Sequence, residues 1–590
     1  MNKHALYHRP KSEMCYAYDT KTIHIYLKSS KLDNLKVHLI YGDPFEWDHK
    51  NGKSNWKHEN TEMKTKYVDN LHKYFFISIS PKYKRLKYLF LIQEKEEKFI
   101  FGTNGISSFK SFDDFNNYNV YKFFNYPFLS QDDLLKPPAW SKNMIWYHIF
   151  PDRFYTDRPN LSWDTNPIFN NQQFGGTIKG IIKKIPYLKD LGIQGIYINP
   201  IFEAYSMHKY DTINYFKIDQ HFGNNEDFKN FVEEAHKNNI KVMLDGVFNH
   251  CGYFHPFFQD VILNGIESKY KNCFYINKFP VDNFELNPDK SPKYFNGTPL
   301  NYSTFGFTPS MPKWNTSNSI VEDHLLSAVK YWIEEYNIDG WRLDVSNEIS
   351  HDFLRKIRSE TKKVKKDFFI LGENWDSSTP WLLGDQLDSV MNYDLSFPIW
   401  DFIENKISSN EFVYQINSYL SRTPKNFISS MFNVTSSHDT IRIKKRVNDN
   451  PKLTKIAYIL SFVCGGSPSI YYGDEVGLSG FDDPNNRLPM IWDENRRDID
   501  MLIFMKKLIA IYKNYELISY YDFKIYSKKN MIILEKKLNK DKVLIIINNS
   551  NNSYNYDIKT KNYKVLMQSD QNKIDPYGYF IGVKDETNNT

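Results

Sequence analysis

Acidic, basic and imidazole side chains follow short apolar runs at four places in this chain of 590 residues. The four segments are DGVFNH (245–250), GWRLD (340–344), LGENW (371–375) and SSHD (436–439). A carboxylate at the end of a buried strand is costly unless it is solvated, paired with a cation or used in a reaction. The recurrence of such segments, with helical stretches between them, predicts a barrel that collects its reactive groups at one rim.

Eight short apolar runs predict the buried strands of that barrel. They cover residues 144–150, 192–200, 241–248, 340–345, 368–374, 388–394, 429–439 and 466–475. Amphipathic patterns over 225–239 and 320–337 predict two of the intervening helices. Eight strands interleaved with helices indicate an α/β fold of the (β/α)8 TIM-barrel type.

The segments outside the barrel differ in pattern, and the chain is too long for one ordinary domain. Residues 1–122 alternate apolar and polar positions between turn residues, which predicts an N-terminal β-sandwich. The barrel is expected over 123–250 and 316–515, on either side of an irregular, aromatic insertion over 251–315 that follows the third strand. Residues 516–590 return to strand-like patterns and predict a C-terminal β-domain.

On a barrel, the carboxyl ends of the strands face a single cleft. That geometry gathers the strand-end residues Asp245, His250, Arg342, Asp344, Glu373, His438 and Asp439. Two carboxyl groups that flank one bond, with one of them protonated, meet the requirement of glycoside hydrolysis. The sequence contains no His or Cys grouping with metal spacing, no GxSxG elbow and no phosphate-binding loop. We therefore expect no metal site.

Composition excludes several other classes of function. The net charge is +6, from 76 basic and 70 acidic side chains that are scattered along the chain, so nucleic-acid binding is not expected. No run of 18 apolar residues and no apolar leader segment occur, which favours a cytoplasmic protein without a membrane partner. The four cysteines form no CxxC motif and are expected to be reduced.

In their order, these segments resemble glycoside hydrolase family 13, the α-amylase family. MPKWN (311–315) resembles the MPKLN segment of the neopullulanase, cyclomaltodextrinase and maltogenic amylase subfamily. IFPDRF (149–154), HKYDT (208–212) and YYGDEVGLSG (471–480) agree with that subfamily. The N-terminal β-domain resembles a family 34 carbohydrate-binding module in position and length. The resemblance covers essentially the whole chain and is strongest over residues 144 to 500.

The resemblance implies retention of the α configuration through a covalent glycosyl-enzyme intermediate, with about 5 to 5.5 Å between the two reacting carboxyl groups. Asp344 aligns with the nucleophile, and its positive neighbour Arg342 predicts a lowered pKa for the Asp344 carboxyl. Glu373 aligns with the general acid/base, for which a raised pKa is expected. Asp439 aligns with the third family carboxylate, which contacts sugar hydroxyls.

Further residues align with substrate-binding positions of the family. His250 and His438 align with histidines that hydrogen-bond sugar hydroxyls, and Tyr210 aligns with an aromatic platform. Trp375 is expected on the acceptor side, and Asp245 is expected to support the arginine. Taken singly, each of these residues is explained as well by a helix cap or by core packing. Taken together and in order, they favour the catalytic interpretation.

Some positions depart from the family pattern. The position of Asn249 ligates calcium in many members, but the loop YTDRPN (155–160) is not rich in Asn and Asp, and Thr177 follows the paired glycines. Because a hard cation needs several oxygen ligands, we expect no calcium there and no cofactor. Asn374 follows the acid/base where relatives often carry an aliphatic residue, which leaves the preferred substrate open. Met311 and Trp314 are predicted to pack under the insertion.

The leading hypothesis is a hydrolase of α-1,4-glucosidic bonds in cyclomaltodextrins, maltooligosaccharides and pullulan, with some transglycosylation. The alternatives are an α-glucosidase or dedicated transglycosidase of the same family and, more remotely, a non-catalytic α-glucan-binding protein. The N-terminal β-domain argues against the first alternative, and the presence of all three carboxylates argues against the last. That domain either binds glucan or covers the neighbouring active site in a homodimer, which the resemblance implies.

Overall fold

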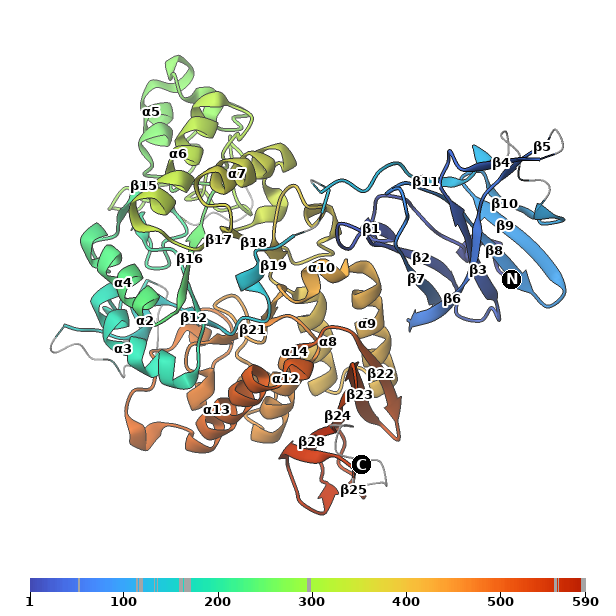
Figure 1. The fold of residues 1–590 in the computed structure, drawn as a ribbon. Helices are drawn as coiled ribbons and strands as arrows, with labels where there is room; N and C mark the ends of the chain where they lie inside the picture. Colours follow the sequence, from blue (N-terminus) through green and yellow to red (C-terminus); the bar gives the residue numbers. More distant parts are fainter. Residues whose placement is uncertain are drawn as a thin grey trace. The chain divides into compact units, whose positions relative to one another are not determined.

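The structure is a computed structural model that describes residues 1–590, with gaps. The gaps are residues 51–52, 113–114, 116–119, 132, 135, 159–162, 164–170, 294–298, 556–559, 561 and 585–590. Two units are distinguished within the chain (Figure 1). One unit contains Met1–Lys136, Ile407–Ile428 and Ile525–Ile533, and the other contains Pro137–Lys406, Ser429–Lys524 and Leu534–Thr590.

Eight parallel strands form the barrel of the second unit. In chain order they are β12 (Trp146–Ile149), β13 (Gly195–Ile198), β16 (Lys241–Gly246), β17 (Gly340–Leu343), β18 (Phe369–Gly372), β19 (Ser389–Val390), β20 (Phe432–Val434) and β21 (Ser467–Tyr471). Their spatial order is β19-β18-β17-β16-β13-β12-β21-β20, and a parallel bridge between Met391 and Phe432 joins the two outer strands. The barrel is therefore closed, and each strand lies within one of the eight predicted runs.

Helices connect these strands and cover the outside of the barrel (Figure 1). They are α3 (Ile178–Leu191), α4 (Asn225–Lys237), α6 (Ser319–Tyr336), α7 (His351–Val364), α8 (Tyr393–Ile403), α12 (Pro451–Val463) and α13 (Ile499–Asn514), with short helices α2 (Pro151–Phe154), α11 (Ile443–Arg446) and α14 (Glu516–Ser519). The two predicted helices correspond to α4 and α6. Helix α4 begins where the sequence provides a reciprocal cap between Asn224 and Asp227. Phe228, Phe231 and Val232 form its buried face.

Two segments leave the barrel after β13 and β16 and form part of the rim at the carboxyl ends of the strands. After β13, a hairpin of β14 (Phe202–Ala204) and β15 (Thr212–Ile218) carries His208 and Tyr210 in its connecting loop. After β16, the predicted insertion forms α5 (Pro256–Asn264) and the 3-10 turns η4 (Gly265–Glu267) and η5 (Lys271–Cys273). Bridges between His250 and Lys313 and between Phe274 and Trp314 tie the insertion together. Trp314 is buried and stacks on Phe274, as predicted.

The N-terminal strands form a two-layered sandwich, which confirms that prediction. They are β1 (Cys15–Ala17), β2 (Ile23–Ser30), β3 (Lys36–Gly42), β6 (Glu59–Val68), β7 (His72–Ile79), β8 (Leu86–Glu94), β9 (Glu97–Gly102), β10 (Gly105–Ser108) and β11 (Phe124–Tyr126), with a separate pair β4 (Trp47–Lys50) and β5 (Lys53–Trp56). Strand β6 pairs with β3 through its first half and with β7 through its second half. One strand therefore contributes to both layers, which enclose a core that includes Ile25, Leu39, Phe75 and Phe90. This unit also contains α9 (Ser409–Arg422) and α10 (Lys425–Ile428).

The C-terminal region is rich in strands, as predicted. A five-stranded sheet has the order β22-β23-β24-β28-β26, and β25 (Tyr554–Asn555) pairs with β27 (Lys573–Ile574). The sheet strands are β22 (Phe523–Lys528), β23 (Met531–Leu538), β24 (Asp541–Asn548), β26 (Lys564–Gln568) and β28 (Tyr579–Lys584). The residue boundaries predicted for the individual domains stay a prediction.

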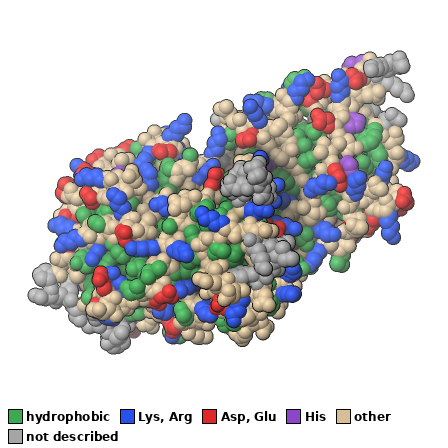
Figure 2. Space-filling view, turned by 60° about the horizontal axis from the view of Figure 1, so that its bottom comes forward, with side chains coloured by type: hydrophobic (Ala, Val, Ile, Leu, Met, Phe, Trp, Pro, Cys, Tyr) green, Lys and Arg blue, Asp and Glu red, His purple; other side chains and the backbone are tan. Residues whose placement is uncertain are grey.

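The cysteines, one face of the surface and the helix lengths bear on three of the sequence expectations. All four cysteines are buried and unpaired with one another. Figure 2 shows Lys and Arg side chains interspersed with Asp and Glu on the visible face, without a basic stripe. Within the described part of the chain, no helix combines the length and apolar character needed to span a bilayer.

Candidate active site

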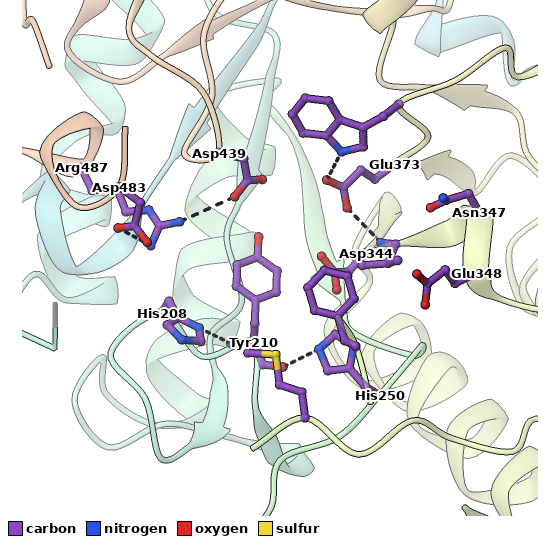
Figure 3. Close-up of a pocket in the computed structure, with 14 residues that line it drawn as sticks. His208, Tyr210, His250, Asp344, Asn347, Glu348, Glu373, Asp439, Asp483 and Arg487 are labelled. Atoms are coloured by element: carbon purple, nitrogen blue, oxygen red, sulfur yellow. Dashed lines mark hydrogen bonds and ion pairs between the residues drawn. The ribbon is translucent and has the colours of Figure 1, made fainter. Parts of the chain in front are cut away.

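A cleft of about 460 Å³ opens at the carboxyl ends of the barrel strands. Its lining residues are His208, Tyr210, His250, Phe305, Met311, Asp344, Val345, Asn347, Glu348, Glu373, Trp375, Asp439, Asp483 and Arg487. In Figure 3, Tyr210 stands in the middle of the view, with Asp344 and Glu373 to one side and Arg487 and Asp483 to the other. Six of the nine predicted site residues line the cleft. The other three, Asp245, Arg342 and His438, are fully buried beside it.

Arg342 connects the carboxylates of three strands. Its Nη1 donates to Asp245 Oδ1 and to Asp344 Oδ1, both at 2.8 Å, and its Nη2 lies 2.8 Å from Glu373 Oε2. Asp245 comes from β16, Arg342 and Asp344 from β17 and the residue after it, and Glu373 directly follows β18. A planar guanidinium with fixed donor directions holds such a set more rigidly than an ammonium group could. The predicted nucleophile and the predicted acid/base therefore share one cation.

The turn after Asp344 has an unusual backbone conformation, which directs a hydrogen bond to Glu373. Val345 has φ 47° and ψ 43°, a left-handed conformation that is costly for a β-branched residue. This turn directs the Val345 N–H to Glu373 Oε2 at 2.9 Å, while the Trp375 indole Nε1 donates to Glu373 Oε1 at 3.0 Å. Figure 3 shows both oxygens of Glu373 engaged in this way. The orientation of the Glu373 carboxyl is thus fixed from two sides.

Tyr210 links the two sides of the cleft. Its hydroxyl donates to Asp245 Oδ2 at 2.9 Å, so it accepts from His438 Nε2, which lies 2.6 Å away. His438 Nε2 also lies 3.0 Å from Asp439 Oδ2. Burial lowers the pKa of His438 well below its ordinary value, so the imidazole is neutral at pH 7 and carries its proton on Nε2. His438 is held behind Tyr210 and Asp439, and its contact with substrate stays a prediction.

The pKa values of the carboxyl groups at the cleft differ from those that the sequence suggested. Burial raises the pKa of Asp344 well above its ordinary value, and the charges of Glu373, Asp245 and Asp439 act in the same direction, while Arg342 opposes them. Arg342 therefore acts in the predicted direction, but the net pKa of Asp344 is raised and not lowered. Desolvation outweighs one cation that is shared among three carboxylates. Burial likewise raises the pKa of Asp439, to about 7, and that of Asp245.

The raised pKa of Asp439 makes a prediction about stability. A carboxyl with a pKa near 3.8 when unfolded and about 7 when folded binds its proton more tightly in the native state, so its contribution to stability falls as pH rises between these values. Asp439→Asn removes this loss. Because the Asp439 side chain is 31% exposed, we expect a gain of only about 1 kcal/mol at pH 8 and almost none at pH 4. Thermal melts of both proteins across this range measure it, and an equal shift at both pH values would contradict it.

Several lining residues were missed by sequence reasoning. Arg487 lies over Asp439, with Nη2 3.6 Å from Oδ1, and its Nη1 lies 3.0 Å from Asp483 Oδ1. Both residues come from the loop after β21, where no recurring pattern marks them. Asn347 and Glu348 directly follow the turn after the predicted nucleophile, and this proximity could have identified them. Met311, predicted to pack under the insertion, lines the cleft.

The oxygen atoms near Asn249 that calcium would need as ligands lie against a lysine ammonium. The ammonium of Lys313 contacts Asn249 Oδ1 and lies 3.2 Å from Glu348 Oε2, so a cationic side chain already neutralises these oxygens. At the paired glycines, Asp152 accepts hydrogen bonds from the backbone N–H groups of Phe174 and Gly175. Among the described residues, no group of three or more His, Cys, Asp or Glu side chains could hold a metal ion. Residues 159–160 of the YTDRPN loop lie outside the described residues, and the expectation that no calcium binds stays a prediction.

Comparisons with known proteins cover nearly the whole chain. The alpha amylase catalytic domain matches residues 148–514, and the alpha amylase N-terminal Ig-like domain matches residues 1–130. A maltogenic alpha-amylase of Bacillus acidopullulyticus is 39% identical over 94% of this chain and 93% of its own length. An intracellular maltogenic amylase of Bacillus subtilis is 38% identical over 93% of this chain and 91% of its own length. The solved structure of a cyclomaltodextrinase superposes with a TM-score of 0.88 at 34% identity, covering 99% of this chain and all of that one.

Proposed function

Because this chain belongs to the α-amylase family and is a glycoside hydrolase, we propose that its cleft hydrolyses α-1,4-glucosidic bonds of cyclomaltodextrins and maltooligosaccharides with retention of configuration. The observation that carries the proposal is the position of Arg342, whose two terminal nitrogens each lie 2.8 Å from one of the two carboxyl groups that retention requires. Relatives named maltogenic amylase and cyclomaltodextrinase support this choice of substrate. Pullulan hydrolysis and transglycosylation are proposed as side activities.

The reaction divides between Asp344 and Glu373. In the first step, an oxygen of Asp344 bonds to the anomeric carbon while the bond from that carbon to the glycosidic oxygen breaks. Glu373 gives its proton to the departing oxygen. In the second step, Glu373 takes a proton from water, the water oxygen bonds to the anomeric carbon, and Asp344 is released as a carboxylate. Two inversions at one carbon leave the product in the α configuration.

The carboxyl cluster sets where the proton resides. Burial raises the pKa values of Asp245, Asp344 and Asp439, and the charges of neighbouring carboxylates act in the same direction on Asp344 and Asp439. The mechanism requires the charge on Asp344 and the proton on Glu373. Arg342 favours the charge on Asp344 because its Nη1 donates to that carboxylate, while Asp245 remains paired with the same nitrogen. Asp439 and Arg487 are then available to sugar hydroxyls on the opposite side of the cleft.

Aromatic rings extend the cleft on the acceptor side. Trp375 stacks on Tyr393 with ring centroids 3.9 Å apart and planes inclined by 12°. Phe397 continues the stack from Tyr393 at 5.7 Å. Trp375 and Phe397 are 37% and 40% exposed, so apolar ring surface remains accessible next to the acid/base. Flat rings of this kind suit the apolar faces of glucose units, and we propose that Trp375 contacts the sugar that leaves.

Release of reducing sugar from maltotriose and β-cyclodextrin tests the proposed activity. We expect both substrates to be hydrolysed. Product profiles over time separate hydrolysis from a dedicated transglycosidase, and release of glucose alone would favour an α-glucosidase. Binding of maltotriose without any turnover would contradict the proposal in favour of a non-catalytic glucan-binding protein.

The Lys313 contacts lead to a prediction about metals. We propose that activity needs no calcium, because the ammonium of Lys313 replaces a metal beside Asn249 and Glu348. Dialysis against EDTA is expected to leave kcat and the melting temperature unchanged. Lys313→Met removes the cation and should lower stability by about 1 to 2 kcal/mol, because Asn249 is left buried without this donor. Loss of activity in EDTA that added calcium restores would contradict the proposal.

We also propose a cytoplasmic location and a homodimer formed through the N-terminal domain. The name of the Bacillus subtilis relative, an intracellular maltogenic amylase, supports the location. The dimer is supported by the resemblance to the cyclomaltodextrinase subfamily. Light scattering coupled to gel filtration of the full chain measures the oligomeric state, and a monomer at micromolar concentration would contradict the dimer.

A further inference from the structure

We propose that Ser346 and Asn374 form a side-chain bridge that positions Glu373 for proton transfer relative to Asp344. The inference rests on the proposed function, because it assigns Glu373 as the acid/base. Ser346 lies two residues after Asp344, in the turn that follows β17. Asn374 lies one residue after Glu373, in the turn that follows β18. The two turns belong to neighbouring strands, since β17 and β18 pair in parallel up to Leu343 and Gly372.

The bridge consists of two short contacts from a single hydroxyl. Ser346 Oγ lies 2.6 Å from Asn374 Oδ1 and 3.0 Å from the carbonyl oxygen of Glu373, and it can donate to either acceptor. Ser346 is fully buried and Asn374 is 1% exposed, so water does not compete for these bonds. Hydrogen bonds between buried groups are stronger than those at the surface, and losing one partner leaves the other unsatisfied.

Gly372 makes the close approach of the two turns feasible. A Cβ atom at Gly372 would lie 2.6 Å from Ser346 Oγ, a distance that would displace the hydroxyl. The absence of a side chain at this position lets Ser346 reach across to the Glu373 peptide. Asn374, two positions after Gly372, stands where relatives often carry an aliphatic residue, and only a polar side chain can accept a hydrogen bond from this hydroxyl.

The bridge completes the fixation of Glu373. Val345 N–H and the Trp375 indole hold the two carboxyl oxygens, whereas the Ser346 hydroxyl is shared between the main-chain carbonyl of the same residue and the Asn374 side chain. Proton transfer depends steeply on the distance and direction between the acid and the departing oxygen. Loosening the Glu373 main chain should therefore slow reactions that need protonation of the leaving group and spare those that do not.

Two substrates distinguish this positioning role from a general structural role. Maltotriose has a sugar leaving group that needs a proton, whereas α-maltosyl fluoride releases fluoride without one. For both, kcat/KM reports the first step alone, up to formation of the glycosyl-enzyme. Ser346→Ala should lower kcat/KM for maltotriose about tenfold and that for α-maltosyl fluoride less than twofold. Asn374→Leu, which keeps the branched shape, should lower the maltotriose value about threefold, because Ser346 still reaches the Glu373 carbonyl.

A double variant and two controls complete the experiment. Ser346→Ala with Asn374→Leu should lose no more than Ser346→Ala alone, because both changes remove one bridge. Ser389→Ala removes a buried hydroxyl in β19, bonded to the Ser430 carbonyl at 2.7 Å, and should affect both substrates equally.

Glu373→Gln should show a far larger loss for maltotriose than for the fluoride. The proposed bridge would be overturned if Ser346→Ala lost activity equally on both substrates while Glu373→Gln still lost far more on maltotriose than on the fluoride. Equal losses in Glu373→Gln would instead overturn the assignment of the acid/base.

Discussion

Asp344→Asn is expected to lower kcat for maltotriose by about 10⁴-fold or more, because the amide cannot form the covalent intermediate. The substitution keeps the shape of the side chain and an oxygen that can accept from Arg342. Since burial raises the pKa of Asp344, the neutral amide should also stabilise the protein at pH 8, where the carboxylate is charged. Steady-state kinetics and thermal melting on the same sample measure both effects.

Asp339 provides a matched control at the opposite end of strand β17. It precedes β17, whereas Asp344 follows it, and its carboxylate contacts His236 at 2.7 Å and Lys241 at 2.9 Å. The hydrogen bonds from His236 and Lys241 and the charge of Lys365 lower the pKa of Asp339 despite its burial. Asp339→Asn should therefore lose stability and keep kcat, the reverse of Asp344→Asn. Wild-type kcat in Asp344→Asn would remove Asp344 from the mechanism.

Arg342→Met is expected to have the largest combined effect on stability and activity. Removal of this guanidinium leaves Asp245, Asp344 and Glu373 buried without their shared cation, which should cost about 3 to 5 kcal/mol at neutral pH. The kcat should fall about 10³-fold, because neither the charge on Asp344 nor the orientation of Glu373 is maintained. Chemical denaturation and kinetics on maltotriose measure these losses.

The pH dependence of this variant gives a second check. Without Arg342, the pKa values of Asp245 and Asp344 rise further above those of the unfolded chain, so stability falls more steeply as pH rises. The deficit relative to the wild type should accordingly be larger at pH 8 than at pH 5. Arg342→Lys keeps a charge but cannot contact three carboxylates with one planar group, and it should recover part of the stability and little of the activity. A deficit that grows toward acid pH would contradict the electrostatic account.

The barrel could be predicted from the sequence because each of its strands is a short, fully buried run. The runs that contain Trp146, Trp341 and Phe369 have no polar alternation, which is typical of parallel strands covered on both faces. The strand-end carboxylates followed from the same pattern. The β14–β15 hairpin was not predicted, although the HKYDT segment that it carries was recognised, because its strands are short and its burial is irregular.

The remaining features depend on distances between remote parts of the chain. Lys313 and Asn249 meet only after the insertion folds back on β16, so their contact could not be read from spacing. Arg487 reaches Asp439 from a loop nearly fifty positions later. The sign of the pKa shift of Asp344 depends on how burial competes with Arg342, and a sequence motif shows the cation but not the desolvation. The sequence therefore identifies the reacting groups better than it predicts their protonation.

The identity of the covalent nucleophile is the central claim, and trapping the intermediate tests it most directly. In Glu373→Gln, α-maltosyl fluoride can still form the glycosyl-enzyme because fluoride leaves without a proton, but no base remains to activate water. The intermediate should therefore accumulate and be visible in the mass spectrum as one added maltosyl group. Peptide mapping should place that group on Asp344. A maltosyl group on Asp439 or elsewhere, or turnover of the fluoride to a β-configured product without any adduct, would contradict the mechanism.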